Sequence, residues 1–444
     1  MIAHTPCISE LRRALDALPA ERQRGFVRLS TPCRMGSPLG WLACQPLFPR
    51  LYWRAREPGA TRYALLGALK TFESLPALER DQHALAALGG EPPAYFGGLA
   101  FDAEAPGWPG YGGCRFVLPR IVLACGAEGE TLTLNLRFDD RERAAELDAA
   151  RAALDSLSLA CTLPSLAPQA YTREDCPGRA QWGERIERLA APEQRRATPK
   201  VVLSRETRLG GAPPPDPWAL LDAWQARAAG CFHFAMQLGL DDAFIGCPPE
   251  RLYRRQGRYL ESEALAGTTH CGESAQERRA LARALLLDAK NGHENQCVYQ
   301  QILTQLEPLS RRLDVGEAHI VTLRSVQHIR RSIEAELHPG VGDRALLERL
   351  PPTPAVGGVP RKAALDFLRE HEAHARGWYA GAFGRVSLDD SDLAVTIRSA
   401  RITGQAVHLY AGAGIVAGSR AEAEWRELDH KIADLMTLLH PATP

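Results

Sequence analysis

The pattern of apolar and polar positions divides this chain into two halves of different texture. Up to about Leu166, short runs of branched and aromatic residues predict strands at Leu51 to Trp53, Tyr63 to Leu66, Phe116 to Leu123 and Thr131 to Leu136. Leucines 11, 15 and 18 recur at helical spacing, and Asp140 to Leu157 forms a second helical stretch. The prolines between Cys161 and Gly178 predict a surface connection to the second half.

Helical and strand-like patterns alternate in the second half. The expected helices run from Trp182 to Ala190, Pro217 to Ala229, Ser274 to Leu287, Asn291 to Gln305, onward from Lys362, and Arg420 to Leu439. The expected strands run from Lys200 to Arg205, Cys231 to Leu238, Tyr379 to Ser387, Leu393 to Ile402 and Ala406 to Tyr410, with a hairpin from Ala243 to Ser262.

Strands outnumber what simple alternation of strand and helix requires. We therefore predict an α/β (α+β) fold class with large, mostly antiparallel sheets flanked by helices. Residues 1–166 are expected to contribute strands to the same body as residues 175–444, where the candidate chemistry lies.

Composition narrows the kind of partner. The 444 residues carry 53 basic and 53 acidic side chains, so no net field attracts nucleic acid or an anionic membrane surface. There is no apolar run of about eighteen residues and no apolar core of signal-peptide length near the N-terminus. The 11 cysteines are scattered singly, which predicts reduced thiols rather than a disulfide framework or a zinc site. We expect a cytoplasmic enzyme that acts on a small molecule.

Lys200 and Glu250 are candidates for proton transfer. Lys200 opens the run Lys-Val-Val-Leu-Ser, where alternation places it in an apolar neighbourhood that would lower its pKa and favour a general base. Glu250 follows a Cys-Pro-Pro turn, where apolar walls would keep a carboxyl protonated. The alternatives are a lysine that reaches water from a strand end, and an ion pair of Glu250 with Arg251 or Arg254.

Carboxylates on two expected helices could hold a metal. Glu424, Glu427 and Lys431 are spaced by three and four residues along the edge of an apolar stripe, so that both carboxylates can face one cavity. Glu294 is the candidate partner from a different helix, because two carboxylates with water and substrate oxygens are a usual magnesium site. Surface ion pairing, for example of Glu427 with Lys431, is the alternative.

Arg398 and a glycine pair are candidates for anion binding. Arg398 is expected on the strand Leu393 to Ile402, opposite its apolar face, where a guanidinium suits a carboxylate or a buried salt bridge. Gly412 and Gly414 offer backbone N–H groups to an anion, although such a pair also marks a bulge or bend.

Taken in order, segments of the second half resemble the chorismate-utilising enzymes, which include isochorismate, salicylate, anthranilate and aminodeoxychorismate synthases. The matching blocks are KVVLSRETRL, PPERLYRR, SEALAGTTH, DAKNGHENQCV, VQHIRRSI, PPTPAVGGVPR, WYAGAFG, TIRSARI, LYAGAGIVAGS and EWRELDHKIADL. The resemblance implies the anthranilate synthase component I-like fold and chorismate as the substrate. Ten ordered blocks are far more specific than any single motif.

The family pattern assigns roles residue by residue. It implies that Lys200 is the base that activates water for attack at ring carbon C2, and that Glu250 is the acid that protonates the departing C4 hydroxyl. It implies Mg²⁺ as cofactor, with Glu294 and Glu427 as ligands and Glu424 behind them. Positions that match substrate-contacting residues of the family are Gly267, Thr268, His328, Tyr379, Arg398, Gly412, Gly414 and Lys431.

Two further features of the resemblance separate the members. A lysine at the position of Lys200 marks members that add water, whereas amine-adding members carry glutamine there, so no glutaminase subunit is expected. The segments LGWLACQPLFPRLYWRAR and ALLGALKTFESL resemble isochorismate synthases of the menaquinone branch. The resemblance therefore implies an isomerase that makes isochorismate, and we expect it to act as a monomer. Salicylate synthase, a siderophore-branch isochorismate synthase and a non-catalytic homologue are the alternatives.

Three positions depart from the family pattern. Pro249 replaces a small residue, Pro351 stands where many relatives have histidine, and Asn291 stands where some have a further carboxylate. They concern loop detail and the surroundings of the metal.

Overall fold

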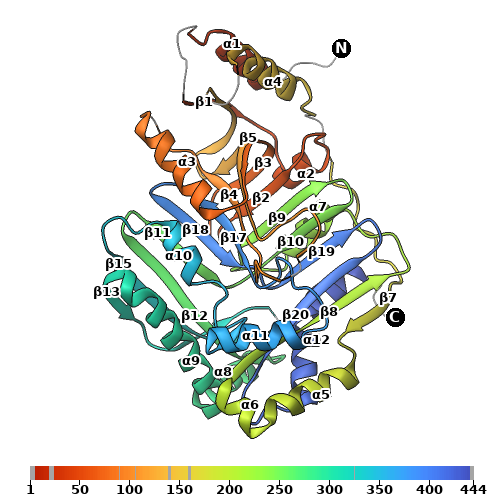
Figure 1. Ribbon diagram of the computed structural model, residues 1–444. Helices are drawn as coiled ribbons and strands as arrows, with labels where there is room; N and C mark the ends of the chain where they lie inside the picture. The colour runs from red at the N-terminus through yellow and green to blue at the C-terminus, as the bar shows by residue number, and fades with distance from the viewer. Residues whose placement is uncertain are drawn as a thin grey trace.

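The architecture is dominated by one 20-stranded sheet in which the paired strands run antiparallel (Figure 1). The computed structural model describes residues 6–19, 25–89, 91–105, 107–138, 142–158, 162–324 and 326–440. The strands of the first half are β1 (Phe26–Cys33), β2 (Arg50–Arg54), β3 (Arg62–Phe72), β4 (Tyr95–Leu99), β5 (Cys114–Gly126) and β6 (Gly129–Arg137).

The strands that follow complete the sheet. They are β7 (Thr172–Cys176), β8 (Lys200–Gly210), β9 (His233–Gly239), β10 (Asp242–Gly246), β11 (Arg251–Gln256), β12 (Tyr259–His270), β13 (Ser310–Val315), β14 (His319–Thr322), β15 (Val326–Leu337), β16 (Gly358–Val359), β17 (Ala382–Val386), β18 (Asp390–Val395), β19 (Ser399–Thr403) and β20 (Val407–Ile415).

Strand pairing joins both halves of the chain. From β8 the sheet passes through β20, β19, β10 and β9 to β2, and then through β3 and β5 to β4. From β4 it returns to the second half through β17, β18, β11, β12 and β15. Each of β2 and β4 therefore pairs with a strand of the first half on one side and with a strand of the second half on the other. These partners are β3 and β9 for β2, and β5 and β17 for β4.

Aromatic side chains fill the core where the halves meet. Trp53 on β2 stacks on Phe232 with ring centroids 5.5 Å apart, and Phe234 stacks on Phe383 at 4.9 Å. All four rings are buried. Such ring pairs stabilise a core by about 0.5–1.5 kcal/mol beyond the area that they bury.

Helices cover the sheet and its ends. They are α1 (Pro6–Asp16), α2 (Pro38–Ala43), α3 (Leu75–Ala87), α4 (Arg143–Asp155), α5 (Arg179–Ala190), α6 (Pro192–Ala197), α7 (Pro217–Gln225), α8 (Ala275–Leu287), α9 (Ala289–Leu306), α10 (Asp343–Arg349), α11 (Arg361–His371) and α12 (Ala421–Leu439), with a 3₁₀ turn at Glu307–Leu309. Figure 1 shows α1 and α4 together at one end of the molecule, and α5, α6, α8 and α9 at the opposite end. The apolar stripe predicted for the last helix is confirmed, because its members are buried on α12.

The structure corrects three expectations about local elements. The expected strand Leu393 to Ile402 is divided into β18 and β19, because Arg398 between them adopts a left-handed φ of 49° that no extended strand accommodates. Ala243 to Ser262 contains three strands, of which only β11 and β12 form a hairpin. The connection from Cys161 to Gly178 includes β7, which pairs with β8; Cys161 itself lies outside the described residues.

Two expectations from composition concern cysteines and membranes. Free thiols are found at Cys7, Cys33, Cys114, Cys125, Cys176, Cys231, Cys247, Cys271 and Cys297. Cys44 is disulfide-bonded, so the expectation of reduced thiols throughout is wrong at that position. Among the described helices, none has both the length and the apolar character needed to span a bilayer.

Candidate active site

A cavity lies between the β8–β20 part and the β12–β15 part of the sheet, and helices α9 and α12 border it. Strands β8 and β20 supply one wall, β12 and β15 supply another, and α9 and α12 each present a carboxylate. The cavity brings together most of the residues singled out from sequence: Glu250, Gly267, Thr268, Glu294, His328, Tyr379, Arg398, Gly412, Gly414, Glu427 and Lys431. Lys200 and Glu424 lie behind its walls.

Glu250 is a buried carboxyl that stays protonated at neutral pH. Only 1% of the residue is exposed, and the Thr353 hydroxyl is its hydrogen-bond donor, 3.4 Å from Oε1. Burial, followed by the negative charge of Glu263, raises the pKa of Glu250 to about 8, whereas Lys200 opposes the shift. The predicted alternative, an ion pair with Arg251, is not formed, because Arg251 binds Glu57 and Asp392. The geometry is that of a proton donor.

Lys200 is the first residue of β8, and its side chain is turned inward. It is 1% exposed, so the alternative of a lysine that reaches water is wrong. Its Nζ donates a hydrogen bond of 3.0 Å to Glu294 Oε1. Gly414 on the neighbouring strand β20 leaves room for this contact, because a Cβ there would lie 2.6 Å from Glu294 Oε1. Sequence alternation therefore predicted correctly that Lys200 is enclosed, but not which group it binds.

Three glutamates on two helices each pair with a different lysine in this region. Burial, the largest single effect, raises the pKa of Glu294 on α9, but the charge and hydrogen bond of Lys200 and the charges of Lys431 and Lys290 together outweigh it, and the pKa lies below its ordinary value. On α12, Glu427 Oε1 accepts a 2.6 Å hydrogen bond from Lys431, and Glu424 Oε1 accepts one of 3.0 Å from Lys290. Burial, then the charge of Glu427, raises the pKa of Glu424. The predicted Glu427–Lys431 ion pair is present, but both residues line the cavity rather than an open surface.

The carboxylates of Glu294 and Glu427 suit a hard cation that takes only a few of its ligands from the protein. Glu294 and Glu427 both line the cavity, and Mg²⁺ in enzymes is commonly held by one or two carboxylates, with water and substrate oxygens completing the octahedron. Among the residues that the structure describes, no cluster of three or more acidic, histidine or cysteine side chains forms a ready-made cage. Each carboxylate is already paired with a lysine, so a cation would compete with these lysines.

Arg398 lines the cavity, and one of its two terminal nitrogens is left without a partner among the described residues. Its Nη1 donates a 2.8 Å hydrogen bond to the carbonyl of Lys431, while its Nη2 is buried and has no hydrogen-bond partner among the described residues. Burial lowers the pKa of Arg398 from its ordinary value. Because a buried unpaired donor is unfavourable, the arrangement suits an anionic ligand that accepts from Nη2. Arg398 reaches this place from a left-handed connector and not from the strand predicted for it.

The facing wall carries neutral hydrogen-bonding groups. His328 Nδ1 lies 3.0 Å from Thr268 Oγ1, and burial, followed by the charges of Arg398 and Lys431, lowers the pKa of His328 to about 3. The imidazole is therefore neutral. Gly267 forms a bulge in β12 with a φ of 83°, which a side chain would disfavour. Thr268 N then donates to Asn291 Oδ1 at 3.2 Å.

Two site features were missed by sequence reasoning. Tyr410 on β20 stacks on Tyr379 with centroids 5.3 Å apart, and both rings line the cavity. Tyr410 is part of a strand predicted from its apolar character, which gave no signal of a binding role. Glu263 also acts on the site through its charge, although it was noted only as part of a matching block.

Sequence similarity identifies the family to which the chain belongs. The family described as "Chorismate binding enzyme" matches residues 15–440, and the chain therefore belongs to that family. Within it, the chain is 36% identical over 407 residues to isochorismate synthase MenF of Escherichia coli (strain K12), with 90% of each chain covered. It is 34% identical to the salicylate biosynthesis isochorismate synthase of Pseudomonas aeruginosa, over 78% of this chain and 74% of that protein.

Solved structures confirm the predicted fold class. The structure of the menaquinone-specific isochorismate synthase MenF from Escherichia coli superposes with a TM-score of 0.89 and 33% identity, covering 98% of this chain and 99% of that one. Anthranilate synthase component I from Streptococcus pneumoniae superposes with a TM-score of 0.66 at 18% identity, covering 94% of this chain and 93% of that one. The second likeness concerns the fold alone.

Proposed function

We propose that this chain is an isochorismate synthase that moves a hydroxyl group from C4 to C2 of chorismate, with magnesium as its cofactor, in menaquinone synthesis. The observation that carries the proposal is the buried, protonated carboxyl of Glu250 in the same cavity as two carboxylates and the unpaired Nη2 of Arg398. Extensive identity to isochorismate synthases supports the substrate and the reaction.

The reaction requires an acid and a base because water is a poor nucleophile and hydroxide a poor leaving group. A C–O bond forms between water and C2 while the C4–O bond breaks, and the ring double bonds shift between these carbons. Glu250 gives its proton to the departing hydroxyl, and Lys200 takes a proton from the attacking water. One proton is given and one is taken, so the enzyme returns to its starting protonation after the two groups exchange a proton with solvent.

Lys200 can accept a proton from water only as the neutral amine, so its ammonium proton must first be released to solvent. Its Nζ lies 3.0 Å from Glu294 Oε1 in a buried setting. Glu294 and Glu427 would hold the cation, with Glu424 behind them. When bound, magnesium would supply positive charge that orients the substrate carboxylate.

The remaining residues bind and orient chorismate. Arg398 and Lys431 offer positive charge to its two carboxylates, and the neutral His328 with Thr268 offers hydrogen bonds without adding charge. Tyr379 and Tyr410 form an apolar surface beside Gly412, where Tyr379 Oη lies 2.9 Å from the place of a Cβ. This enclosure positions the ring for attack. The enzyme would work as a cytoplasmic monomer without a glutaminase, nucleic-acid or membrane partner.

Product analysis tests the proposal. The purified protein is incubated with chorismate, with and without Mg²⁺, and the products are separated chromatographically. A magnesium-dependent mixture of chorismate and isochorismate is expected. Salicylate and pyruvate would instead identify the salicylate synthase reaction, which begins with the same acid and base, and absence of turnover would contradict the enzymatic proposal.

A further inference from the structure

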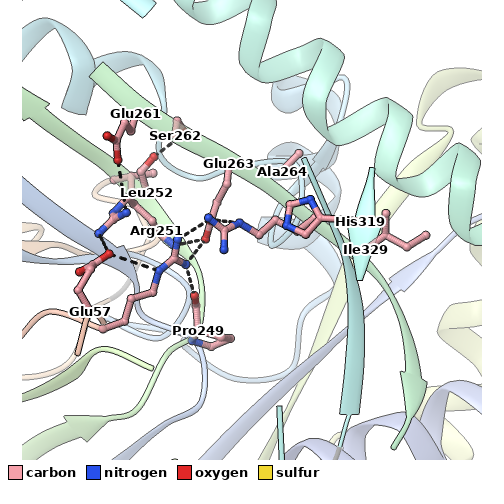
Figure 2. A network of polar contacts seen from close by, with 12 residues as sticks. Glu57, Pro249, Arg251, Leu252, Glu261, Ser262, Glu263, Ala264, His319 and Ile329 are labelled. Atoms are coloured by element: carbon pink, nitrogen blue, oxygen red, sulfur yellow. Dashed lines mark hydrogen bonds and ion pairs between the residues drawn. The ribbon is translucent and has the colours of Figure 1, made fainter. Parts of the chain in front are cut away.

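Beside the acid lies a second buried charge cluster that the proposed chemistry does not use. Arg56, in the loop between β2 and β3, donates through Nη1 and Nη2 to both carboxylate oxygens of Glu263 on β12, at 2.5 and 2.6 Å. Their side chains are 11% and 2% exposed. Arg330 forms a second ion pair with Glu263 at 2.8 Å. Figure 2 shows Glu263 pointing toward Pro249 and Arg251, the two neighbours of Glu250.

The cluster holds the backbone on both sides of Glu250. Arg56 Nη1 donates to the Pro249 carbonyl at 2.7 Å, and Glu263 Oε1 accepts from the Arg251 backbone N–H at 2.8 Å. The carbonyl of Glu250 accepts from Val395 N at 3.0 Å. The two peptide groups that flank the acid are therefore fixed by an ion pair whose members come from different halves of the chain.

We propose that Arg56 and Glu263 are positioning residues for the Glu250 acid, holding its peptide groups so that the carboxyl faces the cavity in one orientation. The inference rests on the proposed function, because Glu250 is the acid only in that reaction. It also gives the first half of the chain a role at the site, since Arg56 lies after β2. A shift of about 1 Å in a catalytic group can cost about 100-fold in rate.

The charge of Glu263 acts on the acid as well. The groups that face Glu250 are Lys200 on β8, Thr353 before β16, Glu263 on β12 and Arg56. Glu263 raises the pKa of Glu250, whereas the two cations lower it. Removing the charge of Glu263 would leave Arg56 and Arg330 uncompensated, which lowers the pKa of Glu250 and deprotonates the acid at a lower pH.

The chain contains a matched control for this cluster. Arg120 donates through both terminal nitrogens to Glu146 at 2.6 and 3.0 Å, and Arg120 also donates to the Asn135 carbonyl at 3.1 Å. Glu146 accepts from the Arg137 backbone N–H at 2.9 Å. This pair has the same hydrogen bonds and similar burial, but it joins β5, β6 and α4 and lines no part of the cavity. A merely structural role would make the two pairs equivalent.

The experiment compares E263Q, R56K and E146Q in the full-length chain by kcat, KM and pH profile with chorismate, and by thermal unfolding. E263Q is expected to lower kcat by about 10- to 100-fold with little change in KM, and to move the basic limb of kcat/KM to lower pH. R56K keeps the charge but loses the bidentate geometry, so kcat falls while the limb moves little. E146Q lowers the unfolding temperature but keeps the kinetics.

The outcomes separate this inference from the proposed function. An active wild-type enzyme whose E263Q and R56K variants keep wild-type kcat and pH profile would overturn the inference alone. The inference would also be overturned if E146Q changed the kinetics as much as E263Q does. If E263Q does not fold, R56K decides by its kcat. A wild-type protein that makes no isochorismate would overturn the proposed function, and the inference with it.

Discussion

Lys200 Nζ lies 3.0 Å from Glu294 Oε1, which joins the proposed base and a proposed metal ligand in one buried ion pair. The two residues come from β8 and α9, 94 positions apart in the chain. In the proposed mechanism, one carboxylate therefore couples proton transfer to cation binding.

Replacing Lys200 by Ala removes the base without removing the groups that bind the substrate. Turnover of chorismate is expected to fall by about 10²- to 10⁴-fold, the usual contribution of a positioned base. Chorismate binding, measured by calorimetry, should persist. Lys362→Ala is the control, because this lysine is 89% exposed and pairs with Asp366 on the protein surface. Near-normal turnover of the Lys200 variant would remove it as the base.

The acid sets a basic limit for activity. Because the pKa of Glu250 is raised to about 8, the carboxyl carries its proton below that pH and loses it above. The kcat/KM for chorismate should therefore fall as the pH rises through about 8, measured at saturating Mg²⁺. Glu250→Gln has no proton to donate, and we expect it to lose activity by about 10²- to 10⁴-fold at all pH values. A variant with the wild-type profile would assign that limb to another group.

Replacing Glu427 by Gln should weaken the dependence on magnesium. The change removes one of two carboxylates that line the cavity, so half-maximal activity should require at least about 10-fold more Mg²⁺. Glu422→Gln is the control on the same helix, because Glu422 is 59% exposed and pairs with Arg179. Identical magnesium titrations for wild type and Glu427→Gln would show that the metal assignment is wrong.

A single methyl group at Gly414 should disturb both functions of the ion pair. Its carbon would lie 2.6 Å from Glu294 Oε1 and 3.2 Å from Lys200 Cε, so one side chain must move. We expect Gly414→Ala to lower turnover and magnesium affinity together while the protein stays folded. Gly292→Ala is the control on α9, where a Cβ meets nothing within 4 Å. That control should keep full activity and gain about 0.5–1 kcal/mol of stability.

Local patterns predicted the parts of the site that depend on local structure. The spacing of Glu424, Glu427 and Lys431 predicted that they share one edge of a helix, which is α12. The alternation of residues along the strand predicted an apolar neighbourhood for Lys200, which is buried. Arg398 could not be placed in this way, because its left-handed φ interrupts an otherwise regular apolar pattern. The strand count likewise predicted antiparallel sheets, but periodicity contains no information about which strands pair.

Contacts between residues far apart in the chain could not be predicted from local patterns. Arg56 and Glu263 are 207 positions apart, and each is an ordinary charged residue in its own segment. Their mutual burial follows from the pairing of β2 with β9 and of β11 with β12, which brings the loop after β2 close to β12. Only the assembled sheet shows that two scattered charges enclose the acid.

The second half of the chain depends on the first for two strand pairings, because β9 pairs with β2 and β17 pairs with β4. A fragment beginning at residue 175 would expose the backbone N–H and C=O groups of β9 and β17, each with a bare apolar edge. Such edges recruit strands from other chains and lead to aggregation. Two fragments divided near residue 166 and produced together should instead find each other, because each holds the strands that the other lacks. The chain would then be a protein that can be split and reassembled, although its catalytic groups lie almost wholly on one side of the cut.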